Sequence, residues 1–351
     1  MISVLSWGFI LISAVFSNRL NFIVTIKKYC GEINDMTLEE VLRARERVIQ
    51  QRIERVSNKK WTELDLSGLN LKELPPEIVN CTHLTRLSLR SNQLTFIPEE
   101  LGQLSSLTSL DLSCNHITSI PESLGQLSNL TWLDLNRNKI NCIPEAFGQL
   151  SNLRGLYLWT NKITSIPETF GQLSSLTCLN LTTNKITCIP ETLGQLSNLE
   201  SFYLDNNQIT SIPEALGQLS NLTKLDLSSN KITSIPEALG QLSNLTWLKL
   251  SHNQITCIPE GLGQLSELKL LTLDNNQITF IPDALGQLSN LECLYLYSNP
   301  ITSIPEAFGQ LFNLRHLYFD TEIVSIPQIL HDMSKQGKVR LGSSWDLFRY
   351  G

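Results

Sequence analysis

Three residues with the side chains of a hydrolytic triad recur at almost equal intervals along the chain. Ser229, with Ser228 beside it, is followed by His252 and Asp274 at steps of 23 and 22 residues. A serine nucleophile needs a histidine base, which a carboxylate in turn orients. No neighbouring sequence feature predicts oxyanion donors or an enclosed pocket. Hydrolysis therefore stays an alternative hypothesis, and His252 is interpreted as an ordinary surface residue.

Two carboxylates show the same interval. Asp111 and Asp134 are 23 residues apart and, on neighbouring strands, would lie about 5 Å apart, close enough to share a cation. Arg90 and Arg137 are near in the same register, so paired surface carboxylates are the favoured interpretation. The histidines and cysteines show no metal-ligand spacing. We expect no metal and no cofactor.

Aromatic residues occupy positions where a solvent-facing strand residue is expected. Adjacent exposed aromatic side chains mark interaction surfaces, and Trp, Tyr and Arg dominate binding energy at interfaces. The sequence therefore predicts a protein-binding surface centred on Trp132, Arg137, Tyr157 and Trp159. The full predicted set is Trp132, Asp134, Arg137, Tyr157, Trp159, Tyr203, Trp247, Tyr295, Tyr297 and Tyr318.

A 23-residue repeat must position all these residues. Its frame is LxxLxLxxNxIxxIPExLGQLSN, and twelve copies begin at every 23rd residue from Trp61 to Leu314. Of the fourteen prolines, only Pro76 and Pro300 lie outside the Pro position of the frame. The repeat therefore governs the backbone conformation as well as the hydrophobic pattern.

Each part of the frame has a physical interpretation. The alternation LxL predicts a short strand with its leucines directed inward. Ile-Pro-Glu places Pro at a first helical position, and the Gly of LGQL is expected to close that turn. An Asn after the strand can pair buried turn groups across neighbouring repeats. This predicted ladder is Asn92, Asn115, Asn138, Asn161, Asn184, Asn207, Asn230, Asn253, Asn276 and Asn299.

The pattern resembles the leucine-rich repeat proteins. LTWLDLNRN, LTKLDLSSN and LTWLKLSHN match their LxxLxLxxN motif, and IPExLGQLSNL resembles the Ras-binding scaffold proteins, the plant Ras-group proteins and the repeat regions of bacterial Roco proteins. The resemblance implies an α/β solenoid: curved, with a parallel sheet on the concave side and short helical or 3-10 turns on the convex side. It also implies protein binding, with a small GTPase as one partner class. The chain has no GxxxxGK[ST] phosphate loop, so GTPase activity is not carried over.

The two ends of the array differ from the repeats. Apolar residues at helical spacing from Leu38 to Val56 predict a helix within residues 37–60 that caps the array. Residues 61–335 hold the repeats, and residues 336–351 form a C-terminal cap and tail with a vestigial strand at residues 339–341.

Residues 1–36 form an apolar N-terminal segment that allows three interpretations. Residues 1–26 contain one charged side chain, Arg19, and are long enough to span a membrane. They could be a signal peptide, a signal anchor that leaves the repeats in the cytoplasm, or sequence upstream of a true start at Met36. Thr37 and Glu40 would form a capping box directly after Met36. A membrane association is expected only if residues 1–26 are retained.

Charge and cysteine content bear on the compartment and the partners. The net charge is −6, and because residues 1–60 carry ten basic and six acidic groups, the rest of the chain carries −10. An acidic array is a poor ligand for nucleic acid. The cysteines do not form the paired clusters of secreted repeat proteins, so we expect reduced thiols in the cytoplasm.

These observations favour a non-enzymatic scaffold that binds a protein on its concave face, in intracellular signalling. A membrane-tethered adaptor or receptor is the alternative, and a hydrolase using Ser229, His252 and Asp274 is the third hypothesis.

Overall fold

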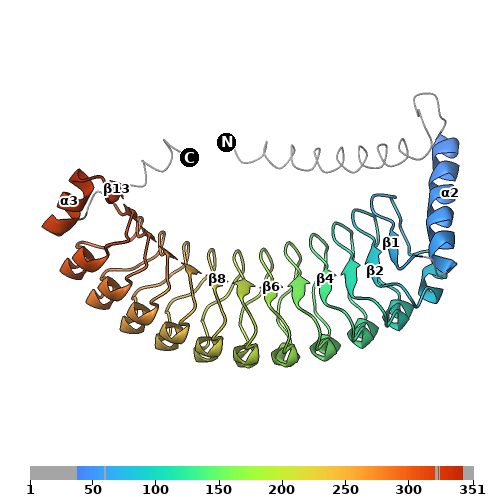
Figure 1. Ribbon diagram of the computed structural model, residues 1–351, viewed down its shortest axis with the longest axis horizontal. Coiled ribbons are helices and arrows are strands. Elements are labelled where there is room, and N and C mark those ends of the chain that lie inside the picture. Colours follow the sequence, from blue (N-terminus) through green and yellow to red (C-terminus); the bar gives the residue numbers. More distant parts are fainter. Residues whose placement is uncertain (1–37, 59–60, 321–322, 324, 343–351) are drawn as a thin grey trace. The chain divides into compact units, whose positions relative to one another are not determined.

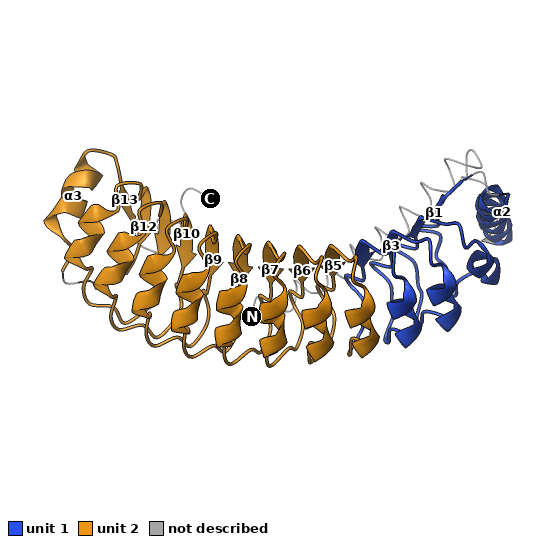
Figure 2. Cartoon of the chain, turned by 60° about the horizontal axis from the view of Figure 1, so that its bottom comes forward, with its two compact units in different colours: residues 1–140 blue, residues 141–351 orange. Residues whose placement is uncertain are grey.

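The computed structural model describes residues 38–58, 61–320, 323 and 325–342. The predictions for residues 1–36, for the Thr37 cap and for residues 343–351 of the tail lie outside this part. Within it, no helix is both long enough and apolar enough to cross a membrane. The chain divides into two compact units, residues 1–140 and residues 141–351 (Figure 2).

The described part of the first unit consists of one long helix followed by alternating strands and 3-10 turns. The helix is α2 (Leu38–Ser57) (Figure 1). It is followed by β1 (Glu63–Asp65), η1 (Pro76–Asn80), β2 (Arg86–Ser88), η2 (Glu99–Gln103), β3 (Ser109–Asp111), η3 (Glu122–Gln126) and β4 (Trp132–Asp134).

The second unit repeats the same alternation and ends in a helix and a strand. Its elements are η4 (Glu145–Gln149), β5 (Gly155–Tyr157), η5 (Glu168–Gln172), β6 (Cys178–Asn180), η6 (Glu191–Gln195), β7 (Ser201–Tyr203), η7 (Glu214–Gln218), β8 (Lys224–Asp226), η8 (Glu237–Gln241), β9 (Trp247–Lys249), η9 (Glu260–Gln264), β10 (Leu270–Thr272), η10 (Asp283–Gln287), β11 (Cys293–Tyr295), η11 (Glu306–Gln310), β12 (His316–Tyr318), α3 (Gln328–Lys335) and β13 (Arg340–Gly342).

In both units the strands pair in parallel and in chain order. The register is one repeat, so that Leu64 lies opposite Leu87 in the first unit and Leu179 opposite Phe202 in the second. The last pair is offset by 24 residues, with His316 opposite Arg340. Strands line one side of each unit and 3-10 turns the other (Figures 1 and 2). The predicted α/β solenoid class is therefore confirmed.

The core lies between the strands and the 3-10 turns. The two inward strand residues of each repeat are buried, as are the isoleucines that precede the prolines from Ile97 to Ile304. Four large aromatic residues, Phe147, Phe170, Phe202 and Phe308, replace leucine or another apolar residue at core positions and are fully buried. The inward alternation predicted for the strands is thus observed directly.

Two details of the turns differ from the sequence prediction. From η2 to η11 the repeat Pro is the N-cap residue, with extended backbone angles such as φ −63° and ψ 142° at Pro144. The first helical residue is therefore the following Glu, or Asp283 in η10. The Gly of LGQL does not end the turn through a positive φ. A Cβ at Gly171 would lie 2.6 Å from the carbonyl oxygen of Thr192, in the next turn. This glycine is needed because successive turns pack backbone to backbone.

The asparagine after each strand joins two repeats. In Asn184, Oδ1 accepts from the Ile163 amide at 3.0 Å, and Nδ2 donates to the carbonyls of Leu158 and Leu181 at 3.0 Å. Asn92 makes the same bonds in the first unit. Every residue that precedes a ladder asparagine has a positive φ, from +52° at Arg137 to +57° at Thr160. The backbone of this turn therefore adopts the left-handed conformation at one residue, which the LxxLxLxxN motif does not predict.

Helix α2 covers the first repeat with an apolar face. Ala44, Val48, Ile49, Ile53 and Val56 are buried, whereas Leu42 is 37% exposed and does not belong to that face. The carbonyl of Val56 lies 2.9 Å from Nε2 of His83, and Arg52 donates to the carbonyl of Asp65. These contacts give the helix the position of a cap.

Candidate functional site: the strand face

The outward residues of the strands form the candidate binding surface, and its C-terminal part is an aromatic cluster. The rings of Tyr295 and Tyr318 stack with centroids 5.0 Å apart, and His316 stacks on Tyr318 at 6.1 Å. Tyr318 is only 6% exposed, because its neighbours cover it. The sequence predicts an exposed contact residue at this position, whereas the structure buries the Tyr318 side chain. Tyr295 and Tyr297 remain half-buried.

Burial also determines the protonation of this cluster. Desolvation raises the pKa of Tyr297 to about 12, and the neighbouring carboxylate of Asp274 adds to the shift. Desolvation also raises the pKa of Tyr295, with smaller contributions from Cys293, Tyr318 and Asp274. Both phenols are therefore neutral at physiological pH and can donate a hydrogen bond to a partner.

The middle of the second unit combines aromatic and charged side chains. Trp247 is 43% exposed, and the Lys224 ammonium lies 4.8 Å from its ring centroid. Lys249 Nζ is 3.3 Å from Asp226 Oδ2. Next to Tyr203, which is half-buried, the pKa of Asp205 is raised by burial although Thr182 donates to it at 2.6 Å. Sequence reasoning missed these charged neighbours, although they occupy the same frame positions as the aromatic residues.

The predicted centre of the surface is divided between the two units. Trp132 and Arg137 belong to the first unit, where Trp132 is half-buried and Arg137 is exposed at its left-handed position. Tyr157 and Trp159 belong to the second unit and are both half-buried. Each pair lies at outward positions, and their union into one binding surface stays a prediction.

Asp134 is the most perturbed carboxylate of the first unit. Its side chain is 9% exposed, and burial raises its pKa to about 6. The amide of Asn136 donates to Oδ1 at 2.9 Å and opposes the shift, whereas Asp111, directly opposite on β3, strengthens it. Asp111 itself accepts two bonds from Ser113. The pair on β3 and β4 is therefore electrostatically strained, with one carboxylate nearly enclosed.

The residues of the hypothetical triad have other partners. Asp274 accepts from the hydroxyl of Ser251 at 2.6 Å and from Nδ2 of Asn275 at 2.9 Å. Nε2 of His252 lies 3.5 Å from the same Asn275 amide. The backbone amide of His252 donates to the backbone carbonyl of Asp274 at 2.9 Å, but among the described residues no side-chain hydrogen bond joins Ser229, His252 and Asp274. Ser229 and His252 occupy left-handed turn positions, whereas Asp274 lies one residue earlier in its repeat.

The described part of the chain contains no group of three or more His, Cys, Asp or Glu side chains that could hold a metal ion. Its cysteines are free thiols: Cys81, Cys114, Cys142, Cys178, Cys188, Cys257 and Cys293. Burial raises the pKa of both Cys178 and Cys293.

Comparison with protein families decides the identity of the repeat. The model described as "Leucine rich repeat" matches residues 60–117, 105–163, 151–209, 197–255 and 266–321. A second model, "Leucine Rich repeats (2 copies)", matches residues 243–288. The chain is a leucine-rich repeat protein. Like the family in general, it presents a scaffold for protein interaction. No curated protein matches it.

Solved structures of leucine-rich repeat proteins are similar over most of the chain. A leucine-rich repeat protein of Leptospira interrogans is 32% identical, with a TM-score of 0.63, over 83% of this chain and 86% of that one. Internalin InlF of Listeria monocytogenes is 26% identical, with a TM-score of 0.63, over 90% and 96%. The Arabidopsis receptor kinase HAESA, solved with the peptide hormone IDA and the co-receptor SERK1, is 31% identical, with a TM-score of 0.66, over 76% and 47%. This chain thus matches about half of the receptor chain.

Proposed function

We propose that this leucine-rich repeat protein binds a protein partner on its strand face and acts as a scaffold in intracellular signalling. One observation carries the proposal. Most large apolar side chains of the described residues are buried, whereas at the outward strand positions Tyr157, Trp159, Tyr203, Trp247 and Tyr297 stay at least partly exposed. Aromatic side chains that stay accessible on a rigid sheet are the residue types that anchor partners.

The charged neighbours support a mixed binding surface. Lys224 lies over the Trp247 ring, and the ion pair of Lys249 with Asp226 lies on the same two strands. A partner would therefore meet aromatic area with both signs of charge beside it. Charged side chains at the edge of an interface orient the partner and speed its association more than they increase the affinity. The proposed surface therefore suits a folded protein or an extended segment with complementary charges.

The resemblance and the comparisons support two further parts of the proposal. HAESA was solved in complex with a peptide hormone and a co-receptor, which supports a protein or peptide ligand here. The IPExLGQLSNL repeat resembles the Ras-group and Roco subgroups, so a small GTPase is the partner class that we propose first. The free thiols of the described residues support a reducing compartment, for which we propose the cytoplasm.

The experiment measures binding and stability on the same variants. A small GTPase of the Ras class is the first partner, followed by any partner identified in a pull-down from a lysate. Trp159→Ala and Trp247→Ala should each weaken binding by about tenfold or more, which corresponds to roughly 1.4 kcal/mol or more. The melting temperature should change little for Trp247→Ala, because that ring is 43% exposed.

The matched control is Phe280→Ala. Phe280 is 66% exposed but lies after the strand, outside the outward strand positions. Its loss should leave binding unchanged. If Phe280→Ala weakens binding as much as Trp159→Ala and Trp247→Ala do, binding does not take place on the strand face.

The membrane-tethered adaptor or receptor is the alternative proposal. It depends on residues 1–26, which contain one charged side chain. Mass spectrometry of the protein from its native cell distinguishes the two. A protein that begins near Met36 supports the cytoplasmic scaffold, whereas recovery of residues 1–26 from the membrane fraction supports the tethered form.

A further inference from the structure

The last residues of β5, β6 and β7 form a regular row on the strand face of the second unit. The strand register places Tyr157 opposite Asn180, and Asn180 opposite Tyr203. All three side chains are half-buried, so part of each is accessible. Because neighbouring strands lie about 4.8 Å apart, the two tyrosines are about 9.6 Å apart, with the shorter asparagine between them.

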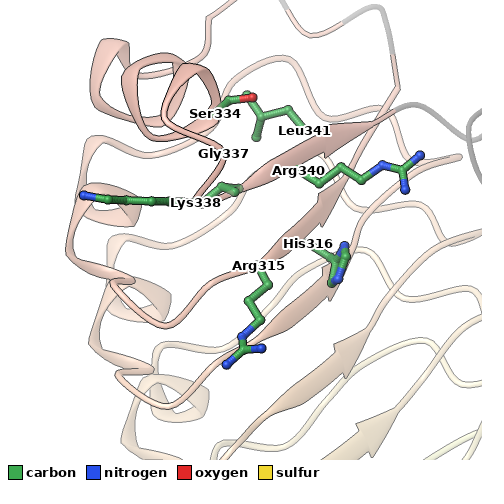
Figure 3. Close-up of a pocket in the computed structure, with 8 residues that line it drawn as sticks. Arg315, His316, Ser334, Gly337, Lys338, Arg340 and Leu341 are labelled. Atoms are coloured by element: carbon green, nitrogen blue, oxygen red, sulfur yellow. The ribbon is translucent and has the colours of Figure 1, made fainter.

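The C-terminal strands of the same unit have no comparable arrangement. On β11 and β12 the same position holds Tyr295 and Tyr318, whose rings stack at 5.0 Å and leave Tyr318 only 6% exposed. Beyond them, the pocket between β12, β13 and the end of α3 has a volume of about 600 Å³. Figure 3 shows the guanidinium groups of Arg315 and Arg340 in this pocket pointing away from each other. Two accessible tyrosines with a polar residue between them therefore occur on β5 to β7.

Two polar groups beside these tyrosines can still bind a ligand. Oδ1 of Asn180 accepts from the Thr182 amide at 3.1 Å, whereas Nδ2 has no hydrogen-bond partner among the described residues. Asp205 lies two residues after Tyr203, on the same face, and accepts from the Thr182 hydroxyl at 2.6 Å. Within the described part of the chain, Asp205 forms no salt bridge. The row therefore offers one hydrogen-bond donor and one negative charge.

The Tyr157 ring is restrained before any ligand binds. Its side chain is hydrogen-bonded to the Cys178 thiol, which lies on the next strand. A ring that is already held by the sheet loses less side-chain entropy on binding. The site is therefore partly preorganised for an apolar ligand group.

The spacing of the two tyrosines selects the conformation of an extended ligand. A polyproline II helix has three residues per turn and rises about 3.1 Å per residue, so its residues i and i+3 lie on one side, about 9.3 Å apart. This distance is close to the 9.6 Å estimated for the two rings from the strand spacing of about 4.8 Å. A β-strand ligand repeats at about 6.8 Å and would not present equivalent side chains to both rings. The carbonyls of a polyproline II helix also lack internal hydrogen bonds, so one can accept from Nδ2 of Asn180.

We propose that Tyr157, Asn180 and Tyr203 bind a proline-rich segment of a protein partner, in the polyproline II conformation, with a basic residue beside its prolines. Prolines three residues apart pack on the two tyrosine rings, as prolines do in other aromatic-lined binding sites. Asn180 donates to a carbonyl between them, and the basic residue pairs with Asp205. The inference rests on the proposed function, because it names the kind of segment that the strand face recognises.

The test is fluorescence polarisation with a labelled peptide of about ten prolines around one central arginine, which offers the required i, i+3 spacing in every register. Saturable binding is expected. Tyr157→Ser and Tyr203→Ser should each weaken it at least fivefold, and β2 already carries serine, Ser88, at this position. Tyr295→Ser on β11 is the matched control and should leave binding within twofold. A peptide with glycine in place of every proline should bind at least tenfold more weakly.

Two further variants test the polar contacts. Asn180→Asp keeps the acceptor for the Thr182 amide but lacks the Nδ2 donor, and it should weaken an arginine-free oligoproline at least threefold. Asp205→Asn should abolish the preference for the arginine-containing peptide over the arginine-free one. Melting curves check that each variant folds. If a serine variant melts early, asparagine, the residue of β6 at that position, replaces the tyrosine instead.

Three results would overturn the inference. They are no saturable binding of the arginine-containing oligoproline, equal binding of the glycine peptide, and a loss in Tyr295→Ser as large as in Tyr157→Ser and Tyr203→Ser. Unchanged binding in Asn180→Asp would contradict the role of its donor. None of these results concerns the proposed function, which fails instead if Trp159→Ala and Trp247→Ala leave the binding of the protein partner intact.

Discussion

At the scale of single residues, buried polar groups explain more of this structure than surface charges do. Asn184 satisfies backbone groups in two repeats at once, and Asp134 is nearly enclosed beside a second carboxylate. Both side chains occupy positions that the repeat dictates. Asn184 stabilises the fold because its polar atoms are hydrogen-bonded, whereas the charged form of Asp134 destabilises it because burial disfavours the charge.

Replacing Asp134 by Asn should stabilise the protein at neutral pH. The folded-state pKa is raised from 3.8 to about 6, so the folded state binds the proton more tightly than the unfolded state. The stability due to that proton is complete below pH 4 and is lost as the pH rises to about 6. Asp134→Asn should therefore add roughly 2–3 kcal/mol at pH 7.5 and nothing at pH 4.

Denaturant unfolding at the two pH values measures this difference. The turn should survive the change, because Asn180, at the same repeat position, accepts the amide of Thr182 in the same way. Asp283→Asn, an exposed carboxylate on η10, is the control and should stay within about 0.5 kcal/mol at both pH values. An equal gain for Asp134→Asn at pH 4 would show that its charge is not the cause.

Replacing Asn184 by Ala should destabilise the array. The substitution leaves the Ile163 amide and the carbonyls of Leu158 and Leu181 without their side-chain partner. The expected loss is about 1–3 kcal/mol in the free energy of unfolding, measured in urea. Thr187→Ala changes an exposed residue three positions further on and should cost less than about 0.5 kcal/mol. Equal losses would show that the ladder bonds contribute nothing specific.

At the scale of elements, the close approach of successive 3-10 turns is the main constraint. Gly171 lies so near to η6 that a Cβ would be 2.6 Å from the carbonyl oxygen and 3.0 Å from the Cβ of Thr192. The strands on the other side of the core have no such restriction. At their first position they carry side chains that differ in size as much as Gly155 and Trp247 do. Variation between repeats is therefore concentrated on the strand face, where the proposed binding takes place.

Gly171→Ala should be destabilising for that reason. The turns on either side have to separate to admit the methyl group, at a cost of about 1–3 kcal/mol. Ala215→Ser is the matched control on η7, since Ser123 occupies the same repeat position on η3. Thermal melting of both variants compares them directly. A Gly171→Ala protein that melts with the parent would mean that the turns can separate without loss.

At the scale of the whole molecule, stacked repeats share a core that must be closed at its ends. Val48, Ile49, Ile53 and Val56 of α2 are buried against the first repeat, and α3 buries Leu330 and Met333 at the other end. Without such caps the terminal repeats would expose their apolar side chains. The sequences of the two caps differ from the repeats because each cap has one face packed on the array and one face exposed to water.

Removing the N-terminal cap should lower the stability of the array. A chain of residues 61–351 loses the apolar face of α2, whereas a chain of residues 36–351 retains it. The shorter chain should melt at a lower temperature and bind a hydrophobic dye such as ANS. Ile53→Ser in the longer chain provides an independent check, with an expected loss of about 2–4 kcal/mol. Equal melting temperatures for the two chains would show that α2 is not a cap.

The sequence by itself determined the repeat, the order of strands and turns, the inward leucines and the helix of residues 38–56. These features depend on local periodicity, and a strand with alternating apolar residues has the same pattern in every repeat. Outward positions such as Trp247 could be predicted for the same reason.

Only the tertiary structure decided what each outward residue contacts. Tyr318 is buried because the rings of Tyr295 and His316 stack on it. The carboxylate of Asp274 accepts a hydrogen bond from Ser251. Gly171 leaves room for the backbone of Thr192, which lies 21 residues further on in the next 3-10 turn. Except for the stack of His316 on Tyr318 within β12, these contacts join residues of different repeats, which the repeat register brings together. A pattern within one repeat carries no information on the shape or charge of the side chain that the next repeat places beside it.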